Sequence, residues 1–449
     1  MPQIALPGPE PTARDRRFLW LLWIIPVLMS LAAVWVLDHT KADRSLFSMT
    51  NLVGPTAQSL LTGGGITACT EEMGTRGNPI CFHAARMPTT AVIVAAGVRL
   101  LGDHYLWVAC FKTLLLLLPV EFAIYLVWCF LPRSKGRRIL VVLLLLAPFG
   151  MTAFLADVSN LLVDEGSSYS FLALAVAIIF VDRRELDSRR GWGRSLLLAA
   201  ALIGLYLSKS GMLLAVIVLL AAFLVMERQV RLRWAVGLLV AAAPIGWAMH
   251  QHHASGRYSV GTSLDGINLH KGNNAGFLRN YPPPHGDSLD WYDFELNRGL
   301  YFRDEWSFND YHRRAAMEYL VTHPRETFEG DLRKVKILFF SVEKYGSTAS
   351  HGARKVIEDA GMVVFRLVFW TAIGTALYLV FRRGSGSDRS LRLAAGTYLA
   401  LVVACTLPYL AGFAYTRHVS VLIYPSVLFC CRVLCAPEWD YNKRDMLTG

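Results

Sequence analysis

Long apolar segments separated by short charged connectors make up most of the chain. Several runs have about 18 or more residues, which is enough for an α-helix to cross roughly 30 Å of hydrocarbon. They are Phe18–Leu37, Tyr105–Leu131, Gly361–Phe381, Leu391–Gly412 and His418–Cys435. The pattern predicts an all-α polytopic membrane protein, and hydrophobic residues at 54% against 18% charged exclude an ordinary soluble domain.

Weaker apolar stretches between these runs extend the prediction to about ten transmembrane helices. Their expected starts are near Phe18, Tyr105, Ile139, Tyr169, Ser195, Gly211, Trp234, Gly361, Leu391 and His418. The apolar segment Pro88–Leu101 is left out, because its roughly 14 residues are too few to cross a bilayer. We expect this segment to lie along the outer membrane face.

Basic residues give the orientation of these spans. We assign to the cytoplasm residues 1–17, 133–138, 182–194, 227–233, 382–392 and the tail from Arg432. These segments hold 22 Lys and Arg against 10 Asp and Glu, whereas the rest of the chain holds 23 against 24. The formal net charge of +11 is therefore the positive-inside signal of a membrane protein, and no nucleic-acid partner is needed to explain it.

This topology divides the chain into five parts. They are a cytoplasmic N-terminus (1–17), an N-terminal transmembrane core (18–250) that includes an outer loop (38–104), a large periplasmic loop (251–360), C-terminal transmembrane helices (361–435) and a cytoplasmic tail (436–449). The large loop is longer than an ordinary connector, which favours a functional role. Its second half predicts a helix that Asn309 caps and Pro324 breaks.

Cys69 and Cys81 are the two cysteines expected outside the membrane, where oxidising conditions favour a disulfide. Closing that loop stabilises it by roughly 2–3 kcal/mol in the chain-entropy model. A metal site is less favoured, because His83 alone adds too few ligands. No metal site is predicted.

Several short segments carry a resemblance to a known family. In chain order they are Ala57–Gly65 (AQSLLTGGG), Arg86–Gly102, which opens Arg-Met-Pro, Leu207–Gly211 (LSKSG), Asn268–Asn274 (NLHKGNN), Ala315–Pro324 and Arg417–Pro425. In this order they resemble motifs of the bacterial GT-C glycosyltransferases, of the kind related to protein O-mannosyltransferases and the lipid A aminoarabinose transferase. The resemblance covers most of the chain.

The resemblance implies a GT-C fold with periplasmic juxtamembrane helices and a defined chemistry. Such a protein moves a hexosyl or pentosyl group from a polyprenyl-phosphate donor to a lipid, glycan or protein acceptor, with inversion at the anomeric carbon. It lies in the bacterial inner (plasma) membrane with its active site facing the periplasm. The lipid-linked donor is its substrate, membrane lipids surround it, and no separate cofactor is implied.

Cations and carboxylates are the side chains that this chemistry needs. Arg86, Lys209, Arg417 and His418 match basic positions of the family and fall at the predicted outer membrane level, where a donor phosphate lies. There a cation stabilises the charge that develops on the leaving phosphate. Asn268, Gly272, Asn273 and Asn274 match the family's loop motif in the large periplasmic loop.

A carboxylate that deprotonates the acceptor is worth about 10²–10⁴-fold in rate. The family acid stands just before the helix of the Ala57–Gly65 motif, but residues 48–55 contain no acid. Asp43 is the nearest candidate and Asp38 the next. Asp164 or Glu165 resembles the second outer-loop acid of the family, which orients the acceptor or assists the base; the alternative is a charge that favours a helix N-terminus.

Other function classes remain open from the sequence. A secondary transporter is also polytopic, but it typically has internal repeats and helices broken at mid-membrane, and we find no repeat. A polysaccharide polymerase or ligase uses the same lipid-linked substrates through an outer-loop site centred on arginine and histidine. A GT-C-like protein without catalytic activity is the third alternative, because the acid is missing from its usual position.

Overall fold

The computed structural model describes residues 13–38, 52–75, 78–128, 134–151, 154–155, 158, 161, 164–180, 188–280, 296–341, 353–382 and 389–447. Within these residues every predicted span has a helix. They are α1 (Ala13–Asp38), α4 (Tyr105–Trp128), α5 (Lys135–Leu146), α7 (Glu165–Phe180), α8 (Ser188–Ser208), α9 (Leu213–Met226), α10 (Val230–Ser255), α16 (Ala353–Phe381), α17 (Arg389–Ala411) and α19 (Ile423–Leu447). The predicted all-α class is confirmed.

Six helical segments in the described part of the chain are long and apolar enough to cross a membrane. They are Tyr105–Trp128, Gly191–Ser208, Val230–Ser255, Val356–Phe381, Arg389–Ala411 and Thr416–Ala436. Of the other predicted spans, α5, α7 and α9 are shorter helices, and α1 contains a shorter apolar segment, Trp20–Val36, so the count of about ten stays a prediction. The last of the six joins α18 (Thr416–Val419), η7 (Ser420–Leu422) and α19.

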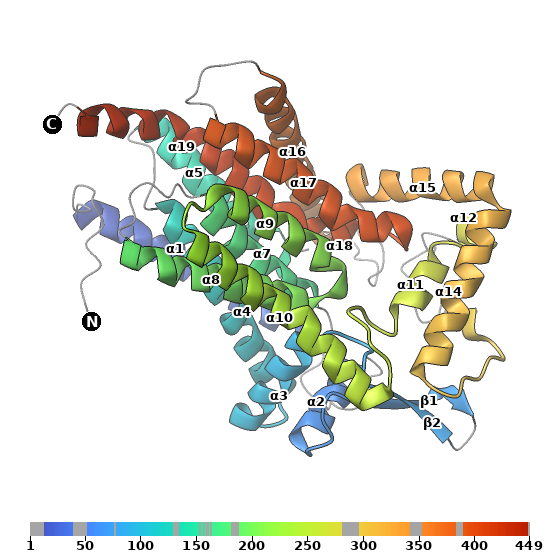
Figure 1. The fold of residues 1–449 in the computed structure, drawn as a ribbon. Helices are drawn as coiled ribbons and strands as arrows, with labels where there is room; N and C mark the ends of the chain where they lie inside the picture. Colours follow the sequence, from blue (N-terminus) through green and yellow to red (C-terminus); the bar gives the residue numbers. More distant parts are fainter. Residues whose placement is uncertain are drawn as a thin grey trace.

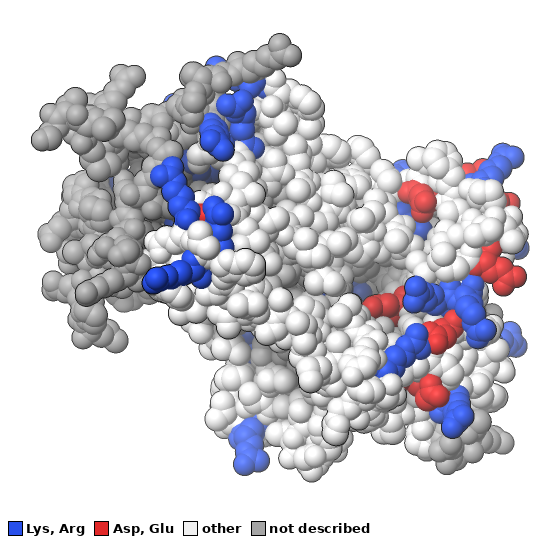
Figure 2. Space-filling view, in the orientation of Figure 1, with Lys and Arg blue, Asp and Glu red and all other residues white. Residues whose placement is uncertain are grey.

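The long helices run side by side, and the first turn of α1 and the last turns of α19 lie at the same end of the bundle (Figure 1). On the face that Figure 2 shows, Lys and Arg side chains predominate at that end, uncharged side chains cover the middle, and both signs of charge lie at the opposite end. We call this opposite end the outer end. It holds the start of α7 and the last turns of α8, α10 and α17. Which side of the membrane this end faces stays a prediction.

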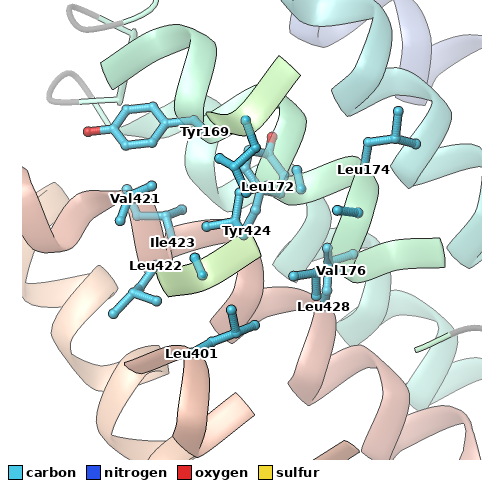
Figure 3. Packing of buried hydrophobic residues seen from close by; sticks show 14 of the residues in the cluster. Tyr169, Leu172, Leu174, Val176, Leu401, Val421, Leu422, Ile423, Tyr424 and Leu428 are labelled. Carbon is cyan, nitrogen blue, oxygen red and sulfur yellow. The ribbon is translucent and has the colours of Figure 1, made fainter. Parts of the chain in front are cut away.

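Helix α7 lies at the centre of the bundle, and apart from Phe171 every residue along it is buried. A helix that is apolar on all sides is stable only when other helices surround it. Leu172 and Val176 of α7 lie beside Tyr424 and Leu428 of α19 in the core (Figure 3). This packing fixes the first turn of α7, which carries Glu165, against its neighbours.

The first outer loop forms a small layer at the outer end. It contains α2 (Val53–Leu61), a two-stranded antiparallel hairpin of β1 (Ala68–Thr75) and β2 (Asn78–Phe82), and α3 (Thr89–Leu101). Cys69 lies opposite Cys81 in the hairpin and is bonded to it, so the predicted disulfide is confirmed. The helix predicted over Pro88–Leu101 is α3, of 13 residues.

The large loop contributes a second outer layer: α11 (Asp265–Lys271), α12 (Phe277–Asn280), α14 (Glu305–Thr322) and α15 (Pro324–Phe339). The sequence predicted Asn309 as the cap of α14, and this was wrong. Asp304 is the cap, because its carboxylate accepts the backbone N–H groups of Trp306 and Ser307 at 3.0 and 2.7 Å. Asn309 lies inside the helix and accepts the Gly266 N–H at 2.9 Å, which joins α11 to α14.

The break at Pro324 is confirmed, since α14 ends at Thr322 and Pro324 opens α15. The far end of α15 is fixed by Arg366 of α16, whose guanidinium donates to the Ile337 carbonyl in the last turn at 3.5 Å and to the Ser341 carbonyl just beyond the helix at 2.9 Å. Carbonyl groups at a helix end lack partners within the helix, so a buried guanidinium there satisfies them. This contact attaches the outer layer to the membrane helices.

Candidate functional site

Two carboxylates lie at the start of α7, at the outer end of the bundle. Asp164 precedes the helix, and Glu165 is its first residue. One turn later, Ser168 and Ser208 share a hydrogen bond of 2.9 Å, which holds the start of α7 against the last turn of α8. Lys209 follows Ser208 directly and opens the short helix η4 (Ser210–Met212), so the fold brings this lysine to the carboxylates.

Three of the predicted cations surround these carboxylates. Arg86 donates to Asp164 Oδ2 at 2.9 Å, and Lys209 Nζ donates to Glu165 Oε1 at 2.8 Å. Arg417 Nε lies 3.7 Å from the same Oε1 atom. We call these five residues the ion cluster. Cations outnumber acids in it, so it carries net positive charge.

The acids of the ion cluster lie deeper than the cations. The Asp164 and Glu165 side chains are 8% and 9% exposed, whereas Arg86 and Lys209 are 35% and 22% exposed. Arg417 is 20% exposed. An anion that approaches from outside therefore meets the cations first.

Burial and charge act in opposite directions on this pair. Burial by itself lowers the pKa of the Lys209 ammonium, but the Glu165 carboxylate outweighs this and the pKa is raised. Burial by itself raises the pKa of Glu165, which precedes the span predicted from Tyr169. The charges of Lys209 and Arg417 lower it well below its ordinary value. Both groups are therefore charged at neutral pH.

Tyr409 of α17 belongs to this site, although nothing in the sequence singled it out. Lys209 Nζ lies 5.3 Å from the centroid of its ring, and His418 stacks on the ring at 3.9 Å. Such a ring face favours a cation in water-poor surroundings. His418 Nδ1 accepts the Tyr415 N–H at 3.2 Å, so the predicted phosphate ligand His418 holds the turn that presents Arg417.

Glu305 holds the segment that precedes Arg86 and so positions this arginine. The sequence did not predict a role for Glu305. Both carboxylate oxygens of Glu305 accept backbone N–H groups, from His83 at 3.1 Å and from Ala84 at 3.0 Å. Gln251 donates to the His83 carbonyl at 3.0 Å. More than 200 residues separate Glu305 from these partners, so no local sequence pattern could have indicated the contact.

The motif Asn268–Asn274 packs on the loop between α17 and α18. Asn273 Nδ2 donates to the Ala411 carbonyl at 2.7 Å, and the Asn274 side chain bonds its own turn, donating to the His270 carbonyl at 2.7 Å. Lys334 supports the last turn of α17, which leads into this loop, by donating to the Leu410 carbonyl at 2.9 Å. The motif thereby positions the segment that leads to Arg417.

Gly272 makes the closest approach in this contact. A Cβ atom built on it would lie 1.7 Å from the Gly412 carbonyl oxygen, and since both partners are backbone neither can rotate away. The Asn268 carbonyl oxygen lies on the other side, 3.2 Å from a Cβ atom built on Gly412. Only glycine fits at position 272.

Replacement of Gly272 by Ala is expected to separate the loop from residues 410–413, because the added methyl group overlaps backbone. We expect a fall in unfolding temperature of several degrees, the size that a loss of about 2 kcal/mol or more produces. A thermal unfolding scan of the purified protein measures it. Gly237→Ala is the matched control, since a Cβ atom there meets nothing within 4 Å; equal unfolding temperatures in the two variants would contradict the contact.

A half-buried histidine and a buried one connect α11 to α14. His270 Nδ1 and His312 Nδ1 are 2.8 Å apart, and His312 Nε2 lies 2.9 Å from Asn297 Oδ1. Burial lowers the pKa of His270 to about 4; burial, His270 and Lys271 lower the pKa of His312 to about 3. Both rings are neutral at pH 7. Because Asn297 Oδ1 can only accept, His312 donates to it from Nε2, and His312 Nδ1 accepts from His270 Nδ1.

This pair predicts that the outer layer weakens in mild acid. When α11 and α14 separate, the two histidine rings become exposed and bind protons between about pH 6.5 and 4, whereas in the folded layer they stay neutral. The free energy that holds α11 against α14 therefore decreases as the pH falls. The loss is about 1.4 kcal/mol per pH unit for each ring, and none is expected above pH 7. Hydrogen exchange of α11 and α14 between pH 4.5 and 8 measures it. His312→Phe should flatten the dependence; an unchanged slope would count against the pair.

The remaining predicted acids lie where the structure gives less detail. Asp43 is outside the described residues. Asp38 is the last residue of α1, and its side chain is not described. Among the described residues, no group of three or more His, Cys, Asp or Glu side chains is arranged to hold a metal ion.

No protein-family model matches the chain, and no curated protein matches it significantly. Among solved structures it is similar to the crystal structure of ArnT from Cupriavidus metallidurans in the apo state. The two share 12% sequence identity over 94% of this chain and 77% of that chain, with a TM-score of 0.39. Function is therefore inferred from the residues of this chain.

Proposed function

We propose that the protein is an inverting glycosyltransferase that takes its sugar from a polyprenyl-phosphate donor at the periplasmic face of the membrane. The observation that carries this proposal is the ion cluster. Arg86, Lys209 and Arg417 come from three distant parts of the chain and converge at the outer end of apolar helices. A phosphate on a lipid lies at that depth, and a soluble acceptor approaches from the water beyond it.

In this proposal the cations bind the donor phosphate and stabilise it as the leaving group. The bond between the anomeric carbon and the phosphate oxygen breaks, and its electron pair stays on the phosphate. The acceptor oxygen bonds the carbon from the opposite face and loses its proton to a carboxylate. Charge-assisted hydrogen bonds from Lys209 and Arg417 are strong because the site is partly buried.

Asp43 is proposed as the carboxylate that takes the proton, with Asp38 as the next candidate. Asp164 is proposed to orient the acceptor. Its Oδ2 atom accepts from Arg86, whereas its Oδ1 atom is buried and has no hydrogen-bond partner among the described residues. A buried acceptor atom of this kind favours binding of a donor such as a hydroxyl group.

The proposal is tested by transfer of a radiolabelled sugar from a polyprenyl-phosphate sugar to membrane lipids, glycans or proteins by the purified protein in nanodiscs. Label in an acceptor that requires both the protein and the donor supports a transferase. Movement of donor across a vesicle membrane without label in any acceptor would instead support a transporter. A protein that binds the donor but does neither would be a GT-C-like protein without activity.

A further inference from the structure

Glu165 engages the two cations that the donor phosphate is proposed to use. Lys209 and Arg417 both point to one carboxylate oxygen, Oε1, at 2.8 and 3.7 Å. An ionised carboxylate and a phosphate oxygen are the same kind of ligand to these cations, because both accept charge-assisted hydrogen bonds. The internal carboxylate therefore occupies the cations in the free protein.

A phosphate is the better ligand for this pair of cations. Arg417 Nε lies 3.7 Å from Glu165 Oε1, beyond hydrogen-bond distance, while Lys209 Nζ lies 2.8 Å from the same atom, so this carboxylate oxygen hydrogen-bonds Lys209 and meets Arg417 Nε only as a more distant charge. A phosphodiester has two non-bridging oxygens and can give one to each cation. Because the cations are more exposed than Glu165, they can turn toward an incoming phosphate while the carboxylate stays beneath.

We propose that Glu165 stands in for the donor phosphate in the free protein, and that donor binding transfers Lys209 and Arg417 to the phosphate and leaves Glu165 protonated. The inference rests on the proposed function. One proton from water is taken up for each phosphodiester bound, and no covalent bond changes. Glu165 then acts as a positioning residue that keeps Lys209 and Arg417 in place before the donor binds. The acceptor proton still goes to the proposed base, and the cations still stabilise the leaving phosphate.

The surroundings of Glu165 explain why its carboxylate takes up a proton when the donor binds. The groups that face it are Lys209 from the α8–η4 turn, Arg417 and His418 from α18, and Tyr409 from α17. Its side chain is 9% exposed, and its charge is maintained against burial by those cations. A carboxylate that loses its cations in a buried position favours the neutral form, with shifts of about 3–5 pKa units for full burial.

The return step explains why such a carboxylate is useful. After transfer, the lipid phosphate remains on Lys209 and Arg417 and must leave. Loss of the proton from Glu165 restores an anion beside both cations, and this anion competes with the bound phosphate. One carboxyl group then holds the two cations in place before the donor binds and favours release of the product phosphate after transfer.

Calorimetric titration with farnesyl methyl phosphate tests the inference. This phosphodiester does not titrate near neutral pH, so proton uptake can be read from the heat in buffers of different ionisation enthalpy at pH 7. Wild-type protein should take up between about half and one proton per diester bound. Glu165→Gln should take up none and should bind at least about tenfold more tightly, because no carboxylate competes for the cations.

Two control variants separate this effect from a general change of charge. Asp164→Asn removes a carboxylate from the same cluster but should keep the proton uptake of the wild type. Glu329→Gln removes an exposed acid that pairs with Arg325 on α15 and should change neither uptake nor affinity. The wild-type measurement needs no variant, so it remains decisive if Glu165→Gln does not fold.

The outcomes distinguish this inference from the proposed function. Wild-type protein that transfers sugar and binds the diester without proton uptake overturns the inference alone. Weaker binding by folded Glu165→Gln than by wild type does the same. Wild-type protein that neither binds the diester nor transfers sugar overturns both.

Discussion

Asp43→Asn is expected to lower turnover by about 10²–10⁴-fold while donor affinity stays nearly unchanged. Asparagine keeps the size of the side chain but cannot accept the proton of the acceptor hydroxyl. The donor phosphate is proposed to bind the cations of the ion cluster, so loss of this carboxylate leaves donor binding intact. Single-turnover transfer of radiolabelled sugar, measured beside donor binding on the same preparation, separates the two effects.

Glu318→Gln is the matched control, because this exposed acid of α14 lies outside the ion cluster. It should transfer sugar at the wild-type rate. Full activity of Asp43→Asn would place the base elsewhere, and Asp38, Asp164 and Glu165 would then be replaced in turn. If all four amide variants kept full activity, the carboxylate-base mechanism would be wrong.

Lys209→Ala should weaken donor binding by about 10- to 150-fold, because a hydrogen bond to a charged group is worth about 1.5–3 kcal/mol. Lys209 is the sharpest test among the cations, since it makes the shortest contact to Glu165 and lies over the Tyr409 ring. Equilibrium binding of a polyprenyl-phosphate sugar to the protein in nanodiscs measures the effect.

The loss of Lys209 also leaves Glu165 buried with less positive charge around it, which destabilises the protein for a separate reason. The double variant Lys209→Ala/Glu165→Gln removes both charges and should recover stability without recovering the wild-type contact to phosphate. Lys336→Ala, an exposed lysine of α15, is the control for net charge. Wild-type donor affinity in folded Lys209→Ala would exclude this lysine from the phosphate site.

The membrane helices could be predicted from the sequence because their signal is local. A run of apolar residues long enough to cross the bilayer can be recognised from those residues alone. This local pattern was sufficient to predict α4, α16 and α17. The start of α14 was predicted less well. Asp304 caps it through two backbone contacts, while Asn309, which also fits the cap pattern, is used between helices.

For the site, the sequence determined which charged residues stand at the outer end but not how they pair. The positive-inside rule placed Arg86, Lys209 and Arg417 at one membrane face, and each follows or precedes an apolar segment. Their partners depend on which helices pack against α7, and that arrangement is a property of the whole bundle. The pairing of Glu165 with Lys209 therefore became visible only in three dimensions.

The sequence by itself determined the class of the protein, the positions of its apolar helices and the disulfide between Cys69 and Cys81, while the orientation of the charged connectors stays a prediction. Each depends on hydrophobicity, on charge or on which segments lie between the apolar runs. Only the tertiary structure revealed the contacts of Glu305 with His83 and Ala84, the Tyr409 ring beside Lys209 and the fit of Gly272 against Gly412. These contacts join residues far apart in the chain, and their free energy arises from packing that no local pattern encodes.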